Sequence, residues 1–186
     1  MRQFHARIRR FIRDRQGVAA IELALIAPVL LLLYFGTVDL GNWYMAHRRL
    51  VVAGSTVTDL TTQSNGQVTK AEIDAFWNGI GRIIAPLKLA NVKMTMRDFR
   101  KKNGAVQQQW SYSANGGSAC GAALTAADMQ VLGTNEMTDG NDILVASVCT
   151  TIAPIALQMF GFTSIDMKYR ISMRPRIGKT LDCTNC

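Results

Sequence analysis

The sequence predicts an α+β protein in which an N-terminal transmembrane helix extends into a long rod. The rod is expected to pack with a small domain of one or two helices and an antiparallel sheet. Three observations predict this fold class: an apolar stretch near the N-terminus, a helical period that continues beyond it, and alternating apolar and polar residues further on. The expected parts are a basic cytoplasmic leader (1–17), a transmembrane helix (18–38), a helical extension (39–62) and an exported α+β domain (63–186).

The apolar stretch runs from Val18 to Val38 and contains one charged residue, Glu22. At about 1.5 Å per residue, a helix of this length covers the roughly 30 Å hydrocarbon core of a bilayer. Trp43 and Tyr44 follow it and fit the outer aromatic belt. The stretch therefore predicts a single membrane-spanning helix in contact with lipid, bent at Pro28.

The positive charge of the chain is concentrated before this helix. Residues 1–17 hold six arginines and one acid, which gives +5 of the formal net charge of +8. Such a cluster keeps the N-terminus in the cytoplasm and favours export of the C-terminal part, here expected in the periplasm. It also argues against nucleic-acid binding, which requires a basic face on a folded domain.

Two other N-terminal signals fit the sequence less well. A cleavable secretory signal predicts a shorter apolar region followed by a small-x-small site, whereas GTVDLGNWY follows here. A lipoprotein signal requires an early cysteine, and the first one is Cys120.

The boundary between the basic and apolar segments carries a distinctive pair of residues. Gly17 ends the charged segment, and Glu22 lies five residues later inside the apolar run. A carboxylate in hydrocarbon costs on the order of a few kcal/mol, so it normally has a partner or a function. The simplest interpretation is that Glu22 extends to the lipid headgroups or meets a leader arginine.

The string RRFIRDRQGVAAIELALIAPVLLLLYFGTVDLG resembles the TadE-like proteins of Tad (Flp) pilus systems, and Gly17 with Glu22 resembles the processing site of type IV pilins and pseudopilins. The resemblance covers roughly residues 9–62 and returns weakly in residues 169–176. It implies that a prepilin peptidase, a membrane aspartyl enzyme, cuts after Gly17 and makes Val18 the first residue.

The resemblance also implies a role for Glu22 in subunit assembly. Its carboxylate would neutralise the new α-amino group of Val18 in a neighbouring subunit, an attraction that low dielectric strengthens. The implied partners are other pilin or pseudopilin subunits and the pilus assembly machinery. Major Flp pilins have Tyr where this chain has Leu23, and they are much shorter. The comparison therefore favours a minor or assembly-related pseudopilin of the inner membrane, which is either incorporated into a surface pilus or acts beside it.

Beyond the membrane, the apolar period predicts a helix that continues to about Thr62 and is broken by Ser64-Asn65-Gly66. Its expected apolar stripe is Leu40, Trp43, Tyr44, His47, Leu50, Val51, Gly54, Val57 and Leu60. Thr69-x-x-Glu72 has the form of a capping box and opens a second helix before Pro86. Its expected apolar face is Ile73, Phe76, Trp77, Ile80, Ile83 and Ile84.

The expected sheet lies in the second half of the chain. Residues 92–97 and 106–112 alternate in polarity on either side of Asn103-Gly104, which predicts a hairpin. Residues 143–151 and 167–174 predict two further strands, with Pro175 ending the last one. Residues 113–142 have no steady period and predict a surface excursion.

Cys120, Cys149, Cys183 and Cys186 all lie in the expected exported part, where disulfides persist. Four cysteines allow three pairings, and the sequence does not choose among them. We favour Cys120 with Cys149 and Cys183 with Cys186. A redox-active C-x-x-C site is the alternative for the second pair, although it is expected at a helix start after a strand.

No catalytic residues, metal site or cofactor is predicted. The only histidines are His5 and His47, which leaves little material for a zinc site or a catalytic triad. Asp139-Gly140-Asn141-Asp142 lacks the closing glutamate of a calcium loop and predicts a turn. The expected function is that of a minor, non-enzymatic pilin-like subunit. An uncleaved, signal-anchored periplasmic interaction or sensor domain is the main alternative, and a secreted thiol oxidoreductase is a third.

Overall fold

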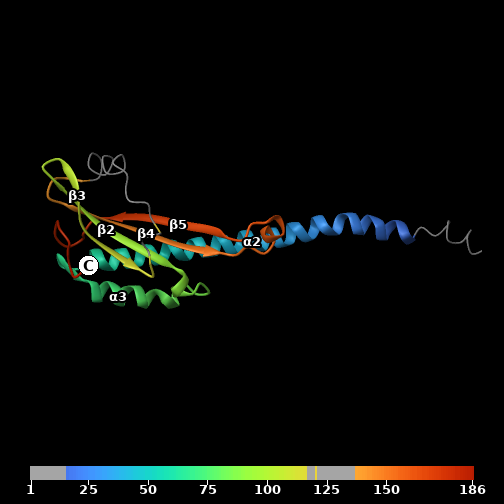
Figure 1. Cartoon of the computed structure of the whole chain (residues 1–186), viewed down its shortest axis with the longest axis horizontal. Helices are drawn as coiled ribbons and strands as arrows, with labels where there is room; N and C mark the ends of the chain where they lie inside the picture. The colour runs from blue at the N-terminus through green and yellow to red at the C-terminus, as the bar shows by residue number, and fades with distance from the viewer. Residues whose placement is uncertain (1–15, 117–119, 121–136) are drawn as a thin grey trace, which may run out of the picture.

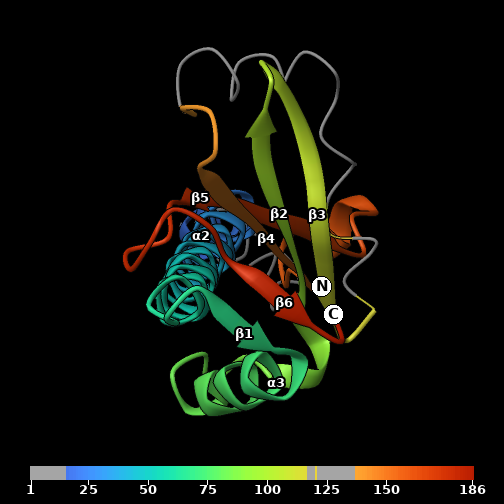
Figure 2. The same ribbon diagram turned by 90° about the vertical axis from the view of Figure 1, so that its left-hand side faces the viewer.

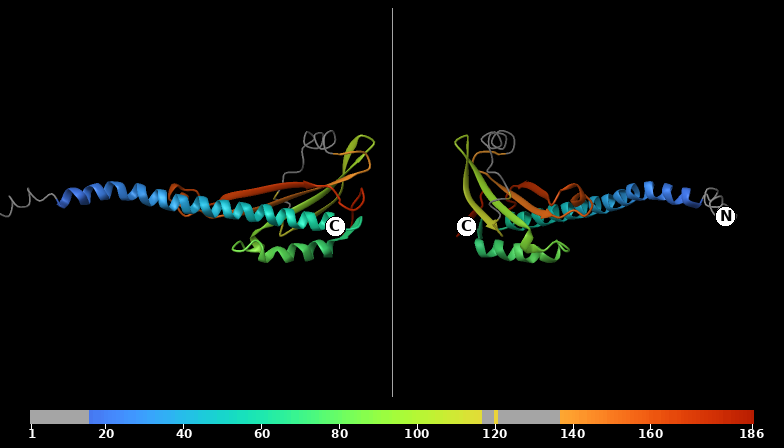
Figure 3. Two further views of the ribbon diagram at one scale, coloured as in Figure 1. Left: turned by 180° about the vertical axis from the view of Figure 1, so that it is seen from behind. Right: turned by 45° about the vertical axis from the view of Figure 1, so that its right-hand side comes forward.

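The structure, a computed structural model, describes residues 16–116, residue 120 and residues 137–186 (Figure 1). Its main element is a single helix, α2 (Gln16–Thr62), of 47 residues. At about 1.5 Å per residue this helix is roughly 70 Å long. Its N-terminal part projects away from the domain, and its C-terminal part lies along the sheet (Figures 1 and 3). The long helix and the α+β domain confirm the predicted fold class, and Pro28 lies inside α2 without ending it.

Four strands form an antiparallel sheet in the order β3-β2-β4-β5. They are β2 (Lys93–Lys102), β3 (Ala105–Ala114), β4 (Asp142–Ile152) and β5 (Ile165–Met173). The predicted hairpin is present, with Lys102 opposite Ala105 and only Asn103 and Gly104 between them. Both turn residues have positive φ, 53° and 80°, as this tight hairpin turn requires.

The outer strand of this hairpin departs from simple alternation. The register of β2 with β3 shifts at one point: Asp98 pairs with Trp110, and Phe99 pairs with Gln108. This bulge sends Trp110 and Tyr112 to the buried face and leaves Gln108 exposed. The predicted excursion of residues 113–142 lies mostly outside the described residues.

One face of the sheet packs against α2. The core between them includes Leu50, Val57, Met94, Met96, Leu144, Ala146 and Val148. Four residues of the stripe predicted for α2 are exposed and do not join this core: Leu40, Trp43, Tyr44 and Leu60. Small residues take a larger share of the buried face than the period suggested, namely Ala46, Ala53, Gly54, Thr58 and Thr61. The helix therefore approaches the sheet closely.

Gly54 is a position in α2 where an added side chain would collide with the sheet. A Cβ atom at this position would lie 2.9 Å from Cγ2 of Val148, a contact that the buried valine cannot readily relieve. We expect Gly54→Val to lower the free energy of unfolding by about 1 to 3 kcal/mol through overpacking. Gly41→Val is the matched control, because no atom lies within 4 Å of a Cβ at Gly41 on the same helix. Denaturant unfolding of the full chain in detergent measures both, and equal losses would contradict the close packing.

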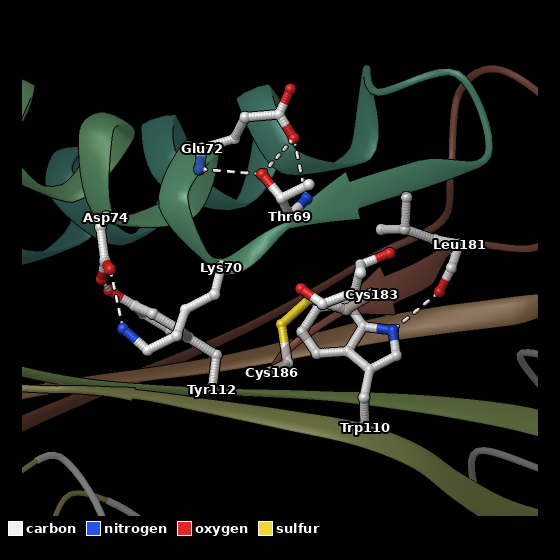
Figure 4. The surroundings of a disulfide bond; sticks show 10 residues. Thr69, Lys70, Glu72, Asp74, Trp110, Tyr112, Leu181, Cys183 and Cys186 are labelled. Carbon is white, nitrogen blue, oxygen red and sulfur yellow. Dashed lines mark hydrogen bonds and ion pairs between the residues drawn. A yellow bond between two sulfur atoms is a disulfide. The ribbon is translucent and has the colours of Figure 1, made fainter.

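The second helix, α3 (Lys70–Gly79), begins with the predicted capping box (Figure 4). The backbone N–H of Glu72 donates to Thr69 Oγ1 (3.2 Å), and the backbone N–H of Thr69 donates to Glu72 Oε2 (2.8 Å). Ile73 and Trp77 are buried. The regular helix ends at Gly79 and passes into a 3-10 turn, η1 (Ile80–Arg82), so the prediction that Ile83 joins the apolar face is wrong: it is 43% exposed.

The C-terminal tail forms a pairing that the sequence analysis did not predict. Strands β1 (Gln67–Thr69) and β6 (Asp182–Thr184) make a separate, parallel two-stranded sheet beside α3 (Figure 2). Two short 3-10 segments complete the described fold: η2 (Leu89–Asn91) precedes β2, and η5 (Leu157–Phe160) lies between β4 and β5. We call residues 153–164, which contain η5, the membrane-side loop.

Candidate functional site

The residues predicted to direct processing and assembly lie in the first turns of α2. Gly17, Val18 and Glu22 are exposed, and Val18 is 53% exposed. The four-residue spacing of Val18 and Glu22 places them on one face of the helix. No described residue forms an ion pair with Glu22. The Glu22 carboxylate is therefore open to a partner from outside the domain, and its assembly role stays a prediction.

A continuous apolar surface follows these residues along α2. Its large side chains are between 37% and 71% exposed: Val18, Ile21, Leu23, Leu25, Ile26, Val29, Leu30, Leu31, Leu32, Leu33, Tyr34 and Phe35. Within the described chain, α2 is the one helix that is long and apolar enough to cross a membrane. Exposed apolar patches on water-soluble proteins are rarely this extensive. The surface is suited to lipid or to other apolar helices.

Asp39 marks the place where this apolar surface meets the domain. It is only 7% exposed, and its carboxylate accepts three backbone hydrogen bonds from the membrane-side loop. The N–H of Ile155 donates to Oδ1 (2.7 Å), and the N–H groups of Ala156 and Leu157 donate to Oδ2 (2.7 and 3.3 Å). These bonds, the one from Ile155 most of all, lower the pKa of Asp39. The ionised carboxylate thus fastens the loop to α2.

An aromatic contact also joins β5 to α2. The rings of Trp43 and His47 are stacked with centroids 5.7 Å apart, and the His47 ring meets the Tyr169 ring edge-on at 6.3 Å. Trp43 and Tyr44 remain 37% and 61% exposed. Their exposure just beyond the apolar surface fits the interfacial position that the sequence suggested.

The sequence analysis missed both Asp39 and the membrane-side loop. A signal for the loop was present, because residues 152–165 contain no charged side chain although they follow the expected strand. Asp39 itself had no such signal, since its partners are 116 to 118 residues away.

The four cysteines form two disulfides, Cys120 with Cys149 and Cys183 with Cys186. These are the pairings that the sequence analysis favoured. The second lies in the tail at β6, near Trp110, whose indole N–H donates to the Leu181 carbonyl (2.7 Å) (Figure 4). Cys183 is in strand β6 and not at the start of a helix after a strand, which is where a redox-active C-x-x-C pair is expected.

The sequence analysis also missed a second group of polar residues, which lies at the end of the sheet where β2 ends and β4 begins. Arg100 donates to both carboxylate oxygens of Asp142 (2.6 and 2.8 Å) and to Asp182 (2.9 Å). The backbone N–H of Leu181 also donates to Asp142 (2.6 Å). The network ties the C-terminal tail to β2 and β4. The predicted turn is present at Asp139-Gly140, and Asp142 begins β4 directly after it. Among the described residues, no group of three or more His, Cys, Asp or Glu could hold a metal ion.

Asp98 borders this network and gives the protein a pH dependence. Its side chain is fully buried, beside the Asp142 carboxylate. Burial, reinforced by the Asp142 carboxylate, raises its pKa from 3.8 to about 8, while Arg100 acts in the opposite direction. The folded state therefore retains a proton that the unfolded state has lost between these values.

We accordingly expect the free energy of unfolding to fall as the pH rises from about 4 to about 8, because the folded state binds more protons in this window. Asp98→Asn cannot ionise, so it should flatten this fall and be more stable than the unsubstituted protein near pH 8. Unfolding of the full chain in detergent at several pH values measures the effect. A pH profile unchanged by the substitution would show that Asp98 is not the titrating group.

The TadE-like protein family matches residues 17–57 of the chain. The match begins at the glycine of the boundary motif, covers the exposed apolar surface and extends into the part of α2 that packs on the sheet. No curated protein and no solved structure matches the chain. The chain thus carries a TadE-like segment in residues 17–57, which confirms the resemblance drawn from its N-terminal sequence.

Proposed function

We propose that this protein is a minor pilin-like subunit that contributes to assembly of a Tad/Flp-type pilus without catalysing a reaction. The observation that carries the proposal is the coincidence of the TadE-like match with an exposed apolar helix that continues into the domain. A helix of this kind provides both a membrane anchor and a surface for packing against similar helices. The family match supports a role connected with the Tad pilus in the membrane.

The finer parts of the proposal concern topology and processing. The arginine-rich leader supports a cytoplasmic N-terminus, and the disulfides support a periplasmic domain, because disulfides persist in oxidising compartments. A prepilin peptidase then cuts after Gly17, and Val18 becomes the first residue. Glu22 joins the protein to pilin or pseudopilin neighbours by pairing with an α-amino group.

The second candidate is an uncleaved, signal-anchored periplasmic interaction or sensor domain. The exposed apolar N-terminal half of α2 and the folded domain at its C-terminal half also fit a protein that stays in the membrane through a single anchor. The two candidates differ in the chemistry of the N-terminus. Intact-mass measurement of the protein purified from its own host separates them: a chain that begins at Val18 supports the pilin-like subunit, and one that retains Met1 supports the anchor.

Gly17→Leu tests the processing step directly. We expect this substitution to block cleavage while membrane insertion continues, because the apolar stretch that inserts is unchanged. Gly36→Leu is the matched control, since Gly36 lies on the same helix and a Cβ atom there has no contact within 4 Å outside the helix backbone. Normal cleavage of Gly17→Leu would contradict the peptidase assignment.

A further inference from the structure

The membrane-side loop exposes apolar side chains that nothing in the described chain covers. Ile155, Leu157 and Phe162 are 52%, 37% and 58% exposed. The segment around them, residues 152–165, has no charged residue, whereas Asp166, Lys168 and Arg170 follow within five positions. A loop of this composition is unusual on a water-exposed surface, where turns are mostly polar. Its exposed side chains therefore indicate a contact with an apolar phase or partner.

The loop lies at the level where the exposed apolar surface of α2 ends. Asp39 is the first residue of α2 after the expected membrane span of residues 18–38, and its carboxylate holds residues 155–157 at this level. Figures 1 and 3 show the loop beside α2, between the sheet and the free N-terminal half of the helix. The helix is apolar and exposed on both sides of this level, at Phe35 and at Leu40. The exposed surface of the loop is thus continuous with the surface that the bilayer would cover.

The backbone of the loop is also prepared for a medium poor in water. Besides the three N–H groups that Asp39 accepts, the N–H of Gly161 donates to the Gln158 carbonyl (3.0 Å) and that of Phe162 to the Leu157 carbonyl (3.1 Å). Gly161 has φ 85°, a conformation that glycine adopts without steric cost and that turns the chain here. These five bonds lower the cost of moving this part of the backbone to a site with less water.

We propose that the membrane-side loop, held by Asp39, inserts Ile155, Leu157 and Phe162 into the outer interface of the bilayer that α2 crosses. The exported domain then lies on the lipid surface through two contacts, the helix and the loop, which restricts its tilt and rotation about α2. This inference rests on the membrane anchoring in the proposed function. It is independent of cleavage and of pilus assembly.

Spin labelling of the full chain in vesicles of phosphatidylethanolamine and phosphatidylglycerol, at a high ratio of lipid to protein, tests the proposal. The four native cysteines are in disulfides, so an introduced cysteine is the free thiol that takes the label. Phe162→Cys reports the loop, Leu33→Cys the apolar surface of α2, and Gln107→Cys the exposed far strand β3. The measured quantity is the collision rate of each label with oxygen, which concentrates in lipid, relative to a water-soluble nickel chelate.

We expect the labels at positions 162 and 33 to collide more with oxygen and the label at 107 to collide more with the nickel chelate. Adding Asp39→Asn should shift the label at position 162 toward the nickel chelate, because the loop loses its charged acceptor. No shift in this variant would overturn the tethering role of Asp39.

The control labels separate failure of this inference from failure of the proposed anchoring. Lipid contact at position 33 with water contact at position 162 would overturn the inference and leave the anchoring intact. Water contact at both positions would overturn both. Shielding of position 162 from both reagents would show that protein and not lipid covers the loop, and would also overturn lipid insertion.

Discussion

Glu22→Gln is expected to abolish pilus formation while leaving synthesis, membrane insertion and cleavage near normal. The substitution keeps the size of the side chain and its hydrogen-bonding ability but removes the charge that is proposed to pair with the α-amino group of a neighbouring chain. Loss of one member of a buried pair costs about 3 to 5 kcal/mol. At about 1.4 kcal/mol per tenfold, assembly should weaken by more than a hundredfold. Pilus counts and crosslinking to pilin partners measure this loss.

A double substitution shows whether the amine is the partner of Glu22. In a chain that keeps its leader through Gly17→Leu, no α-amino group forms at Val18. If the neighbouring subunits also keep their leaders, no α-amino group is available to pair with Glu22. Gly17→Leu with Glu22→Gln should then crosslink to its partners as much as Gly17→Leu alone. Glu22→Asp keeps the charge and should retain part of the assembly that Glu22→Gln loses.

The outcomes for Glu22 point to distinct roles. Normal pilus formation by Glu22→Gln would return the residue to the simplest interpretation, an acid that extends to the lipid headgroups. Failure of cleavage would move its role to peptidase recognition. Glu22 is exposed, so its side chain is accessible to a neighbouring subunit, to the lipid headgroups or to the peptidase. These experiments distinguish the three roles.

Arg100→Met should destabilise the domain by about 2 to 3 kcal/mol, because it leaves the fully buried carboxylate of Asp142 without its cation. This loss of unfolding free energy is smaller than that expected for a fully buried pair, because the Arg100 side chain is 22% exposed and solvent screens its charge. Denaturant unfolding of the full chain in detergent measures it. Lys102→Met, an exposed change on the same strand, should have little effect.

Two further variants locate the origin of this loss. Asp182→Asn removes the exposed partner of Arg100 and should cost at most about 1 kcal/mol. Asp142→Asn combined with Arg100→Met should recover part of the loss, because no buried charge then remains at Asp142. If Arg100→Met behaves like Lys102→Met, the network does not contribute to stability.

The sequence alone determined the elements whose signals are local. The end of α2 at Thr62, the capping box of Thr69 and Glu72, and the Asn103-Gly104 turn each depend on residues within a few positions of one another. Such features are readable because helical and strand periods and turn geometry act over short distances. The same reasoning found Gly17 and Glu22, where a charged leader meets an apolar run.

Only the tertiary structure decided which distant segments meet. It paired β1 with β6, fastened the loop at Ile155 to Asp39, and joined Arg100 to Asp142 and Asp182. These partners are between 42 and 116 residues apart in the chain, or belong to a three-residue strand too short to show a period. A hydrogen bond between such residues leaves no repeat in the sequence, since it depends on how α2, the sheet and the tail pack together. For this reason the local sequence pattern predicted the helix that is long and apolar enough to cross a membrane, and only the packing of distant segments placed the loop beside it.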